Sequence, residues 1–212
     1  MKEYYSVDKK AIAKTTVKKS VFIAAVMPIE DVADAEYSID CIKREYYDAT
    51  HNCYAYIAGE NEFRCGDDGE PQGTAGLPML SVLKKRKLNK ILSVVTRYFG
   101  GVKLGAAGLV AAYTKALLDC LDAAEIKKYV FCTVFRLKID YSYIKAVDAV
   151  LKKFNSRIVE TIYTENVIYT VYAEEGLRGI IENAIIENTN GNAEICYIDT
   201  KYCPYETLNE IC

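Results

Sequence analysis

The chain has 212 residues, of which 51 % are hydrophobic and 26 % charged, and its formal net charge is −2. This length fits one large domain or two small ones, and the composition is typical of a globular rather than a disordered protein. The longest mostly apolar stretch, 104–113, is too short to cross a bilayer, and the N-terminus shows no apolar signal segment. A cytoplasmic protein without membrane contact is therefore expected.

The eight cysteines are scattered and form no Cys-x-x-Cys pair, and the chain has a single histidine, His51. A zinc site needs ligands at closer and more regular spacing, so neither a metal site nor a cofactor is predicted. Without a route to an oxidising compartment, the cysteines are expected to be reduced and mostly buried.

The first half of the chain mixes the periods of strands and helices. Residues 1–28 alternate polar and apolar side chains, which indicates a hairpin or two strands, and residues 30–47 have apolar side chains at helical spacing. The elements predicted next are a strand at 52–58, a polar loop at 66–76, a helix at 78–87, a strand at 91–98, a glycine-rich turn at 100–108 and a helix at 109–124.

The second half has a different pattern. Its predicted elements are a strand at 129–141, a helix at 143–154, strands at 157–164 and 167–173, a helical stripe at 177–185 and a strand at 193–202. The order βαββαβ predicts a small ferredoxin-like domain. The fold class predicted for the whole chain is α+β, with domains at 1–127 and 128–212.

Positive charge gathers in the middle of the chain. No Asp or Glu occurs between Pro71 and Leu118, whereas this span holds eight basic residues. A basic face within a nearly neutral protein is typical of a phosphate-bearing partner. The alternative is that 84–90 is a solvated helix end, where cations are favourable in any case. The residues predicted to contact nucleic acid are Lys84, Lys85, Arg86, Lys87, Lys90, Arg97 and Lys103, with Tyr98 or Phe99 for base stacking.

Gly100, Gly101, Gly105 and Gly108 lie between a predicted strand and a predicted helix. Backbone amides at a helix start can hold an anion, and glycines let the backbone approach it. The spacing matches neither a Walker loop nor a dinucleotide-binding fingerprint. A tight strand-to-helix connection explains the same glycines, so both interpretations stay open.

Asp67, Asp68 and Glu70 form an acidic cluster, and His51 is the candidate to act together with it. Such clusters bind hard cations or perform acid–base chemistry, but more often they form turns and cap helices. Cys53 lies two residues from His51, which is a common packing arrangement along a strand. The sequence contains no motif of a serine hydrolase or zinc peptidase, and no catalytic residue is assigned.

Three segments together resemble the signature of the IMPACT/YigZ family: 67–80, 94–105 and 108–113, preceded by a similar strand at 51–56. Two positions depart from the family pattern. Ala106–Ala107 replaces a pair that often contains threonine and glycine, and Ala111 replaces a basic residue. The matched motif residues are His51, Asp67, Asp68, Gly69, Glu70, Pro71, Gly73, Thr74, Ala75, Gly76, Arg97, Tyr98, Gly100, Gly101, Lys103, Leu104, Gly105, Gly108 and Leu109.

The resemblance implies a fold for each domain and a role in translation. The N-terminal domain would have a left-handed βαβ fold similar to the second domain of a small-subunit ribosomal protein and to domain IV of elongation factor G. The C-terminal domain would resemble domain V of that factor. Eukaryotic members of the family regulate translation by competing for an activator of the kinase that phosphorylates initiation factor two.

Three functions follow as hypotheses. The first is a non-enzymatic protein that regulates translation by binding RNA or the ribosome through the basic face. The second is a regulator that contacts a protein partner without nucleic acid. The third is a hydrolase or other enzyme acting on a small phosphorylated or peptide substrate through the acidic cluster. A dinuclear peptidase is disfavoured because one histidine is too few for the usual ligand set.

Overall fold

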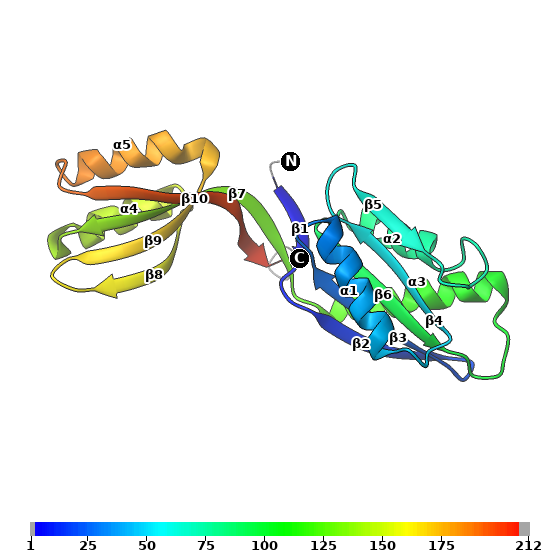
Figure 1. Cartoon of the computed structure of the whole chain (residues 1–212). Helices are drawn as coiled ribbons and strands as arrows, with labels where there is room; N and C mark the ends of the chain where they lie inside the picture. The colour runs from blue at the N-terminus through cyan, green and yellow to red at the C-terminus, as the bar shows by residue number, and fades with distance from the viewer. Residues whose placement is uncertain (1–2, 208–212) are drawn as a thin grey trace. The chain divides into compact units, whose positions relative to one another are not determined.

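The computed structural model describes residues 3–207 and contains two compact units, one built mainly from residues 3–128 and the other from 129–204 (Figure 1). The long strand β7 (Ile126–Ile139) begins in the first unit and continues into the second. Each unit has a sheet and helices, so the predicted α+β class is confirmed.

The N-terminal unit contains a five-stranded antiparallel sheet with the order β2-β3-β6-β4-β5. Because β3 and β4 both pair antiparallel with the central strand β6, they run parallel to each other, and α1 connects them. The strands are β2 (Ala11–Val17), β3 (Ser20–Pro28), β4 (His51–Ile57), β5 (Phe63–Gly66) and β6 (Ile91–Tyr98), and the helix is α1 (Val32–Glu45).

Alternation along the strands assigns the two faces of this sheet to different helices. On β6, Leu92 and Val94 pack with α1, whereas Ile91 and Val95 pack under α2 (Gly76–Lys85) and α3 (Gly105–Ala123). The same alternation directs Arg97 to the α2/α3 face. Its cross-strand partner on β4 is His51, so these two motif residues meet at one end of the sheet.

The C-terminal unit has the predicted order βαββαβ and the strand order β10-β7-β9-β8 of a ferredoxin-like fold. Strand β1 (Glu3–Val7) also pairs with β7. Both helices pack on one face, over alternate β9 residues such as Val167 and Val171. The remaining elements are α4 (Ile144–Lys153), β8 (Arg157–Tyr163), β9 (Val167–Glu174), α5 (Arg178–Asn188) and β10 (Glu194–Thr207), with short 3-10 turns before each helix.

The structure differs from the predicted elements in three places. Residues 3–28 form three strands rather than two, and β5 lies in a segment with no predicted strand. Helix α3 begins at Gly105, not at 109, so the second part of the predicted glycine turn is helical. Gly105 has a φ of +73° and the good helix formers Ala106 and Ala107 follow it, so the turn is complete at Gly105.

Candidate functional site

Asp67 organises the loop that joins β5 to α2. Its Oδ2 accepts a hydrogen bond from the amide of Gly73 (2.8 Å), and its Oδ1 accepts from the amides of Ala75 (3.0 Å) and Gly76 (2.8 Å). Ala75 occupies the N-cap of α2 and has no side chain that caps the helix. The Asp67 side chain therefore caps α2 in place of the N-cap residue, and the hydrogen bonds to these amides occupy both of its carboxylate oxygens.

Asp68 ties the loop to the start of β4. Its carboxylate accepts from Lys43 Nζ (2.6 Å) and from the amide of Asn52 (2.7 Å). Partial burial acts to raise the pKa of Asp68, but these hydrogen bonds and the charge of Lys43 outweigh it and lower that pKa. The Asp68 carbonyl accepts from His51 Nδ1 (2.8 Å), and this contact fixes the proton on Nδ1.

Glu70 is the centre of a buried polar network. Its side chain is 3 % exposed, and its Oε1 accepts from Arg97 Nη1 (2.5 Å) and from the Tyr113 hydroxyl (2.8 Å). His51 Nε2 lies 3.9 Å from the same oxygen. Charged side chains are buried this deeply only when they are paired, so Glu70 and Arg97 depend on each other.

The Arg97 guanidinium is only partly satisfied. Apart from the bond to Glu70, its Nη2 donates to Ser20 Oγ over a long 3.4 Å, and its buried Nε has no hydrogen-bond partner among residues 3–207. The guanidinium carbon lies 5.5 Å from the centre of the Phe22 ring and 5.6 Å from that of Phe99. A positive group with an unused donor thus lies between two aromatic rings.

Cys53 is not an activated nucleophile. Burial raises the pKa of its thiol to about 12, with further upward contributions from Glu70 and Asp68. The Sγ atom donates to the Asp67 carbonyl (3.0 Å) and contacts the Tyr113 hydroxyl (3.4 Å). Because only a thiolate attacks substrates efficiently, Cys53 acts here as a packing and hydrogen-bonding residue.

A cavity of about 390 Å³, hereafter the motif pocket, opens above this network. Eight of the family-motif residues identified from the sequence line it. Most of the other motif residues build the 67–76 loop, and Gly100 is required because a Cβ there would lie 2.0 Å from the carbonyl carbon of Lys19. The lining residues are Thr50, His51, Glu70, Pro71, Arg97, Phe99, Lys103, Leu104, Gly105, Ala106 and Leu109.

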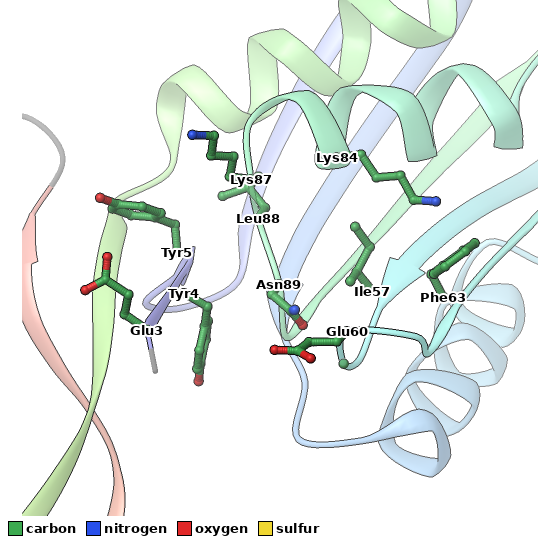
Figure 2. Close-up of a pocket in the computed structure, with 11 residues that line it drawn as sticks. Glu3, Tyr4, Tyr5, Ile57, Glu60, Phe63, Lys84, Lys87, Leu88 and Asn89 are labelled. Carbon is green, nitrogen blue, oxygen red and sulfur yellow. The ribbon is translucent and has the colours of Figure 1, made fainter. Parts of the chain in front are cut away.

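A second, larger concavity of about 560 Å³ lies at the other end of the same sheet (Figure 2). We call it the lysine groove. It begins where β4 ends at Ile57, whereas the motif pocket lies where β4 begins at His51, roughly 20 Å away at the usual rise per strand residue. The lining residues are Glu3, Tyr4, Tyr5, Ile57, Gly59, Glu60, Phe63, Lys84, Lys87, Leu88 and Asn89.

The structure does not gather the eight basic residues of the acid-free span on one face. Arg97 is buried against Glu70. Arg86 pairs with Asp122 (2.8 Å), Lys115 pairs with Asp119 (2.8 Å), and Lys90 Nζ donates to the Glu30 carbonyl. Tyr98, predicted to stack on bases, is half-buried and its hydroxyl donates to Asp48 (2.8 Å).

Four lysines of the span remain without a carboxylate at ion-pair distance within residues 3–207. Lys84, Lys85 and Lys87 lie together at the end of α2, and Lys84 and Lys87 line the lysine groove. Lys103 lies at the motif pocket. The predicted basic face is therefore divided between two sites.

Sequence reasoning missed several contributors to these sites. Tyr113, Ser20 and Lys43 complete the polar network from elements distant in sequence, and Phe63 faces the lysine groove. Within residues 3–207, no cluster of His, Cys, Asp and Glu has the arrangement of a metal site. In the same range no helix is long and apolar enough to span a membrane. The seven described cysteines are free thiols, of which four are buried.

Comparison with known proteins matches both units to family models. Residues 18–121 match the Impact N-terminal domain, and residues 137–192 match a domain of unknown function, DUF1949. A solved structure titled as that of a hypothetical protein aligns with a TM-score of 0.62 at 27 % identity, covering 94 % of this chain and 98 % of the other.

Curated relatives extend over most of the chain. It is 37 % identical to "IMPACT family member YvyE" of Bacillus subtilis over 91 % of its own length and 89 % of the relative's. It is 33 % identical to "IMPACT family member YigZ" of Escherichia coli, covering 73 % and 78 % of the two chains. A "Protein IMPACT homolog" of Dictyostelium discoideum is 38 % identical over 53 % of this chain and 34 % of that protein.

Proposed function

The chain belongs to the IMPACT family, and from that premise we propose that it is a cytoplasmic, non-enzymatic protein that acts in translation by binding RNA or the ribosome through its lysine groove. The family resemblance supports the link to translation. The choice of the groove rests on the structure, and the binding chemistry is that of phosphate recognition by lysine.

The observation that carries this proposal is the group of unpaired lysines at the end of α2. Lys84, Lys85 and Lys87 have no carboxylate at ion-pair distance within residues 3–207, in contrast to Arg86 and Lys115 of the same span. Ammonium groups that keep their charge exposed are available to neutralise phosphates, which supplies most of the affinity in non-specific nucleic-acid binding.

Aromatic side chains accompany these charges. Lys84 Nζ lies 3.4 Å from the centre of the Phe63 ring, and Figure 2 shows the ammonium directed toward that ring. Phe63 is 45 % exposed, and Tyr4 and Tyr5 also line the groove. Bases of single-stranded RNA stack on exposed rings while neighbouring lysines hold the phosphates, so the groove combines both elements of such a site.

Two carboxylates also line the groove, and they bear on its charge. Glu3 pairs with Lys128 (2.9 Å), so its charge is already compensated. Glu60 lies in the groove beside Asn89 (Figure 2). Lys84 and Lys87 line the same groove, so its positive charge exceeds the single charge of Glu60.

An enzymatic function has less support from the geometry. The carboxylates of Asp67 and Asp68 are occupied by backbone amides and Lys43, and burial keeps Cys53 protonated. The acidic cluster that suggested catalysis is thus largely part of the loop structure. A protein partner that binds the groove without nucleic acid is the alternative, and salt dependence separates the two.

Co-sedimentation with ribosomes and with a free structured RNA, at roughly 50 and 200 mM salt, tests the proposal. We expect binding at the lower salt that weakens steeply at the higher, because each phosphate contact contributes about −0.7 to −0.9 to the slope of log K against log salt. The variant Lys84→Gln/Lys85→Gln/Lys87→Gln should lose about two units of that slope.

A matched control removes three lysines from the other unit. Lys145, Lys152 and Lys153 are exposed on α4, and Lys153 Nζ lies 5.3 Å from the centre of the Phe154 ring. Their triple glutamine variant should bind nearly as the unaltered chain does. Equal losses in both variants, or no binding at either salt, would refute the proposal. Ribosome binding that salt does not weaken would favour a protein partner instead.

A further inference from the structure

The motif pocket has the features of a ligand site that the proposed function does not use. Its polar floor is buried far more deeply than a surface loop requires, with side-chain exposures of 3 % for Glu70 and 6 % for Arg97. The cavity volume, about 390 Å³, lies within the range of small-molecule sites. Most of the other lining is apolar, from Pro71, Phe99 and Leu109 among others.

The charge that remains at this pocket is positive. The negative charge of Glu70 is matched by Arg97 at 2.5 Å, and the Arg97 guanidinium still has a buried donor, Nε, without a partner. Lys103 is exposed at the rim, with no carboxylate at ion-pair distance in the described part of the chain. The protein itself therefore leaves positive charge at this pocket unbalanced, which favours an anion there.

The start of α3 adds to the positive electrostatic potential at the pocket. The helix has 19 residues, its first turn contains no acidic residue, and its N-cap, Leu104, offers no side-chain acceptor to the free amides. Leu104, Gly105 and Ala106 line the pocket, and a Cβ added at Gly105 would meet nothing within 4 Å. The positive end of the helix dipole is thus open to the cavity.

The arrangement of donors selects among anions. Lys103 approaches from the loop, the amides of 105 and 106 from the helix start, and the Arg97 guanidinium from β6. Donors from three elements match a tetrahedral group with three acceptor oxygens better than a planar carboxylate with two. Phe99 is 47 % exposed at the pocket and offers a ring against which a flat body can stack.

We propose that the motif pocket binds a terminal phosphate monoester carried on a flat aromatic body, as in a nucleoside 5′-monophosphate. The phosphate lies at the start of α3 between Lys103 and Arg97, and the body packs against Phe99 and Leu109. The same chemical group occurs in free nucleotides and at the 5′ end of an RNA chain. The site is distinct from the lysine groove, and neither depends on the other.

Calorimetric titration of the full chain with AMP, with inorganic phosphate, and with a short RNA bearing either a 5′-phosphate or a 5′-hydroxyl tests this. We expect saturable binding of AMP, of the 5′-phosphorylated RNA, or of both, and weaker binding of inorganic phosphate and of the 5′-hydroxyl RNA. AMP binding without a preference between the two RNAs would assign the site to free nucleotides, and the reverse would assign it to RNA ends.

The informative variant is Ala106→Asp. It places a carboxylate in the pocket, yet an acid in the first turn of a helix favours the fold, so lost binding will not reflect unfolding. We expect affinity to fall by at least about tenfold, since a like charge at close range costs more than 1.4 kcal/mol. Ala107→Asp, in the same turn but outside the pocket lining, should have a much smaller effect.

Lys103→Gln should weaken binding by about tenfold, whereas Lys87→Gln at the lysine groove should leave it unchanged. The proposal is overturned if no phosphate ester binds saturably, if inorganic phosphate binds as tightly as AMP and the 5′-phosphorylated RNA do, or if Ala106→Asp and Ala107→Asp behave alike. Because the ribosome experiment uses other residues, either proposal can fail while the other stands.

Discussion

At one end of the N-terminal sheet, the motif pocket keeps Glu70 and Arg97 almost fully buried and bonded to each other. At the other end, the lysine groove leaves Lys84 and Lys87 in solvent, with an aromatic ring as the partner of Lys84. Both sites use charged residues of neighbouring sequence segments. They differ in how the charges are neutralised: Glu70 and Arg97 neutralise each other inside the protein, whereas the groove lysines remain available to a binding partner.

This difference separates the two effects that a substitution can have. Removing a buried partner leaves an uncompensated charge, so the free energy of unfolding should fall. Removing an exposed lysine changes the stability little, because surface ion pairs contribute at most about 1 kcal/mol. Variants of the buried Glu70–Arg97 pair should therefore destabilise the fold, and variants of the groove lysines should reduce binding to a stable protein.

The largest effect is expected for Arg97→Met. It removes the bond to Glu70 and leaves that carboxylate buried, which typically costs about 3–5 kcal/mol. Denaturation with urea at pH 7 measures the loss, and Lys87→Met serves as the exposed control, with an expected change within about 0.5 kcal/mol. A loss below about 1 kcal/mol for Arg97→Met would show that the pair contributes no more than a surface ion pair.

The double variant Glu70→Gln/Arg97→Met sharpens this prediction. Glutamine at position 70 keeps an acceptor for the Tyr113 hydroxyl but carries no charge. Adding Glu70→Gln to Arg97→Met should therefore restore part of the stability that Arg97→Met alone removes. If the losses of unfolding free energy measured for Glu70→Gln alone and Arg97→Met alone simply add in the double variant, the penalty arises from altered packing rather than from an unpaired charge.

Asp68→Asn should have an intermediate effect that depends on pH. Because the folded state lowers the pKa of Asp68, its contribution to stability is complete above the unfolded pKa, near 4, and is lost as the pH falls through the folded value. We expect a loss of about 1 kcal/mol at pH 7 that shrinks below about pH 4. Urea denaturation at both pH values measures it, with the exposed Asp40→Asn as control. A pH-independent loss would contradict the role of the Lys43 contact.

Much of the fold follows from residue patterns. The mostly apolar, buried-looking run at 91–98 and the helical spacing of α4 predict those elements, and the order of the second half predicts the ferredoxin-like unit. Strand β5 escapes prediction because it has four residues and no buried position, so it lacks the alternation that marks a half-buried strand. Its pairing with β4, a tertiary contact, makes it a strand.

The sequence predicts the candidate sites only in part, because they too depend on tertiary contacts. The motif residues indicate one cluster, and most of them do meet at the motif pocket or the loop beside it. The acid-free span suggests one basic face because charge along the chain does not show which carboxylates fold back. Asp122, Asp119 and Glu30 lie outside the span, yet they or their backbone carbonyls take up three of its cations.

The smallest effect, and the clearest separation of stability from binding, is expected for Lys87→Gly. Lys87 follows the C-cap of α2 with a φ of +54°, a left-handed conformation that glycine adopts without the cost of a Cβ. Relief of this strain outweighs the greater freedom of glycine in the unfolded chain, so stability should rise by about 0.5 kcal/mol. The substitution also removes one groove charge, so RNA affinity should fall and the salt slope should shrink by roughly 0.7–0.9. Urea denaturation of the sample measures the change in stability, and salt-dependent RNA binding of the same sample measures the change in affinity.

Lys85→Gly, within the helix, is the matched control: it loses the same charge but should lose about 1 kcal/mol of stability. If Lys87→Gly lowers stability and leaves RNA binding intact, Lys87 belongs with the structural charges of the motif pocket, and the comparison between the two ends of the sheet fails at that residue.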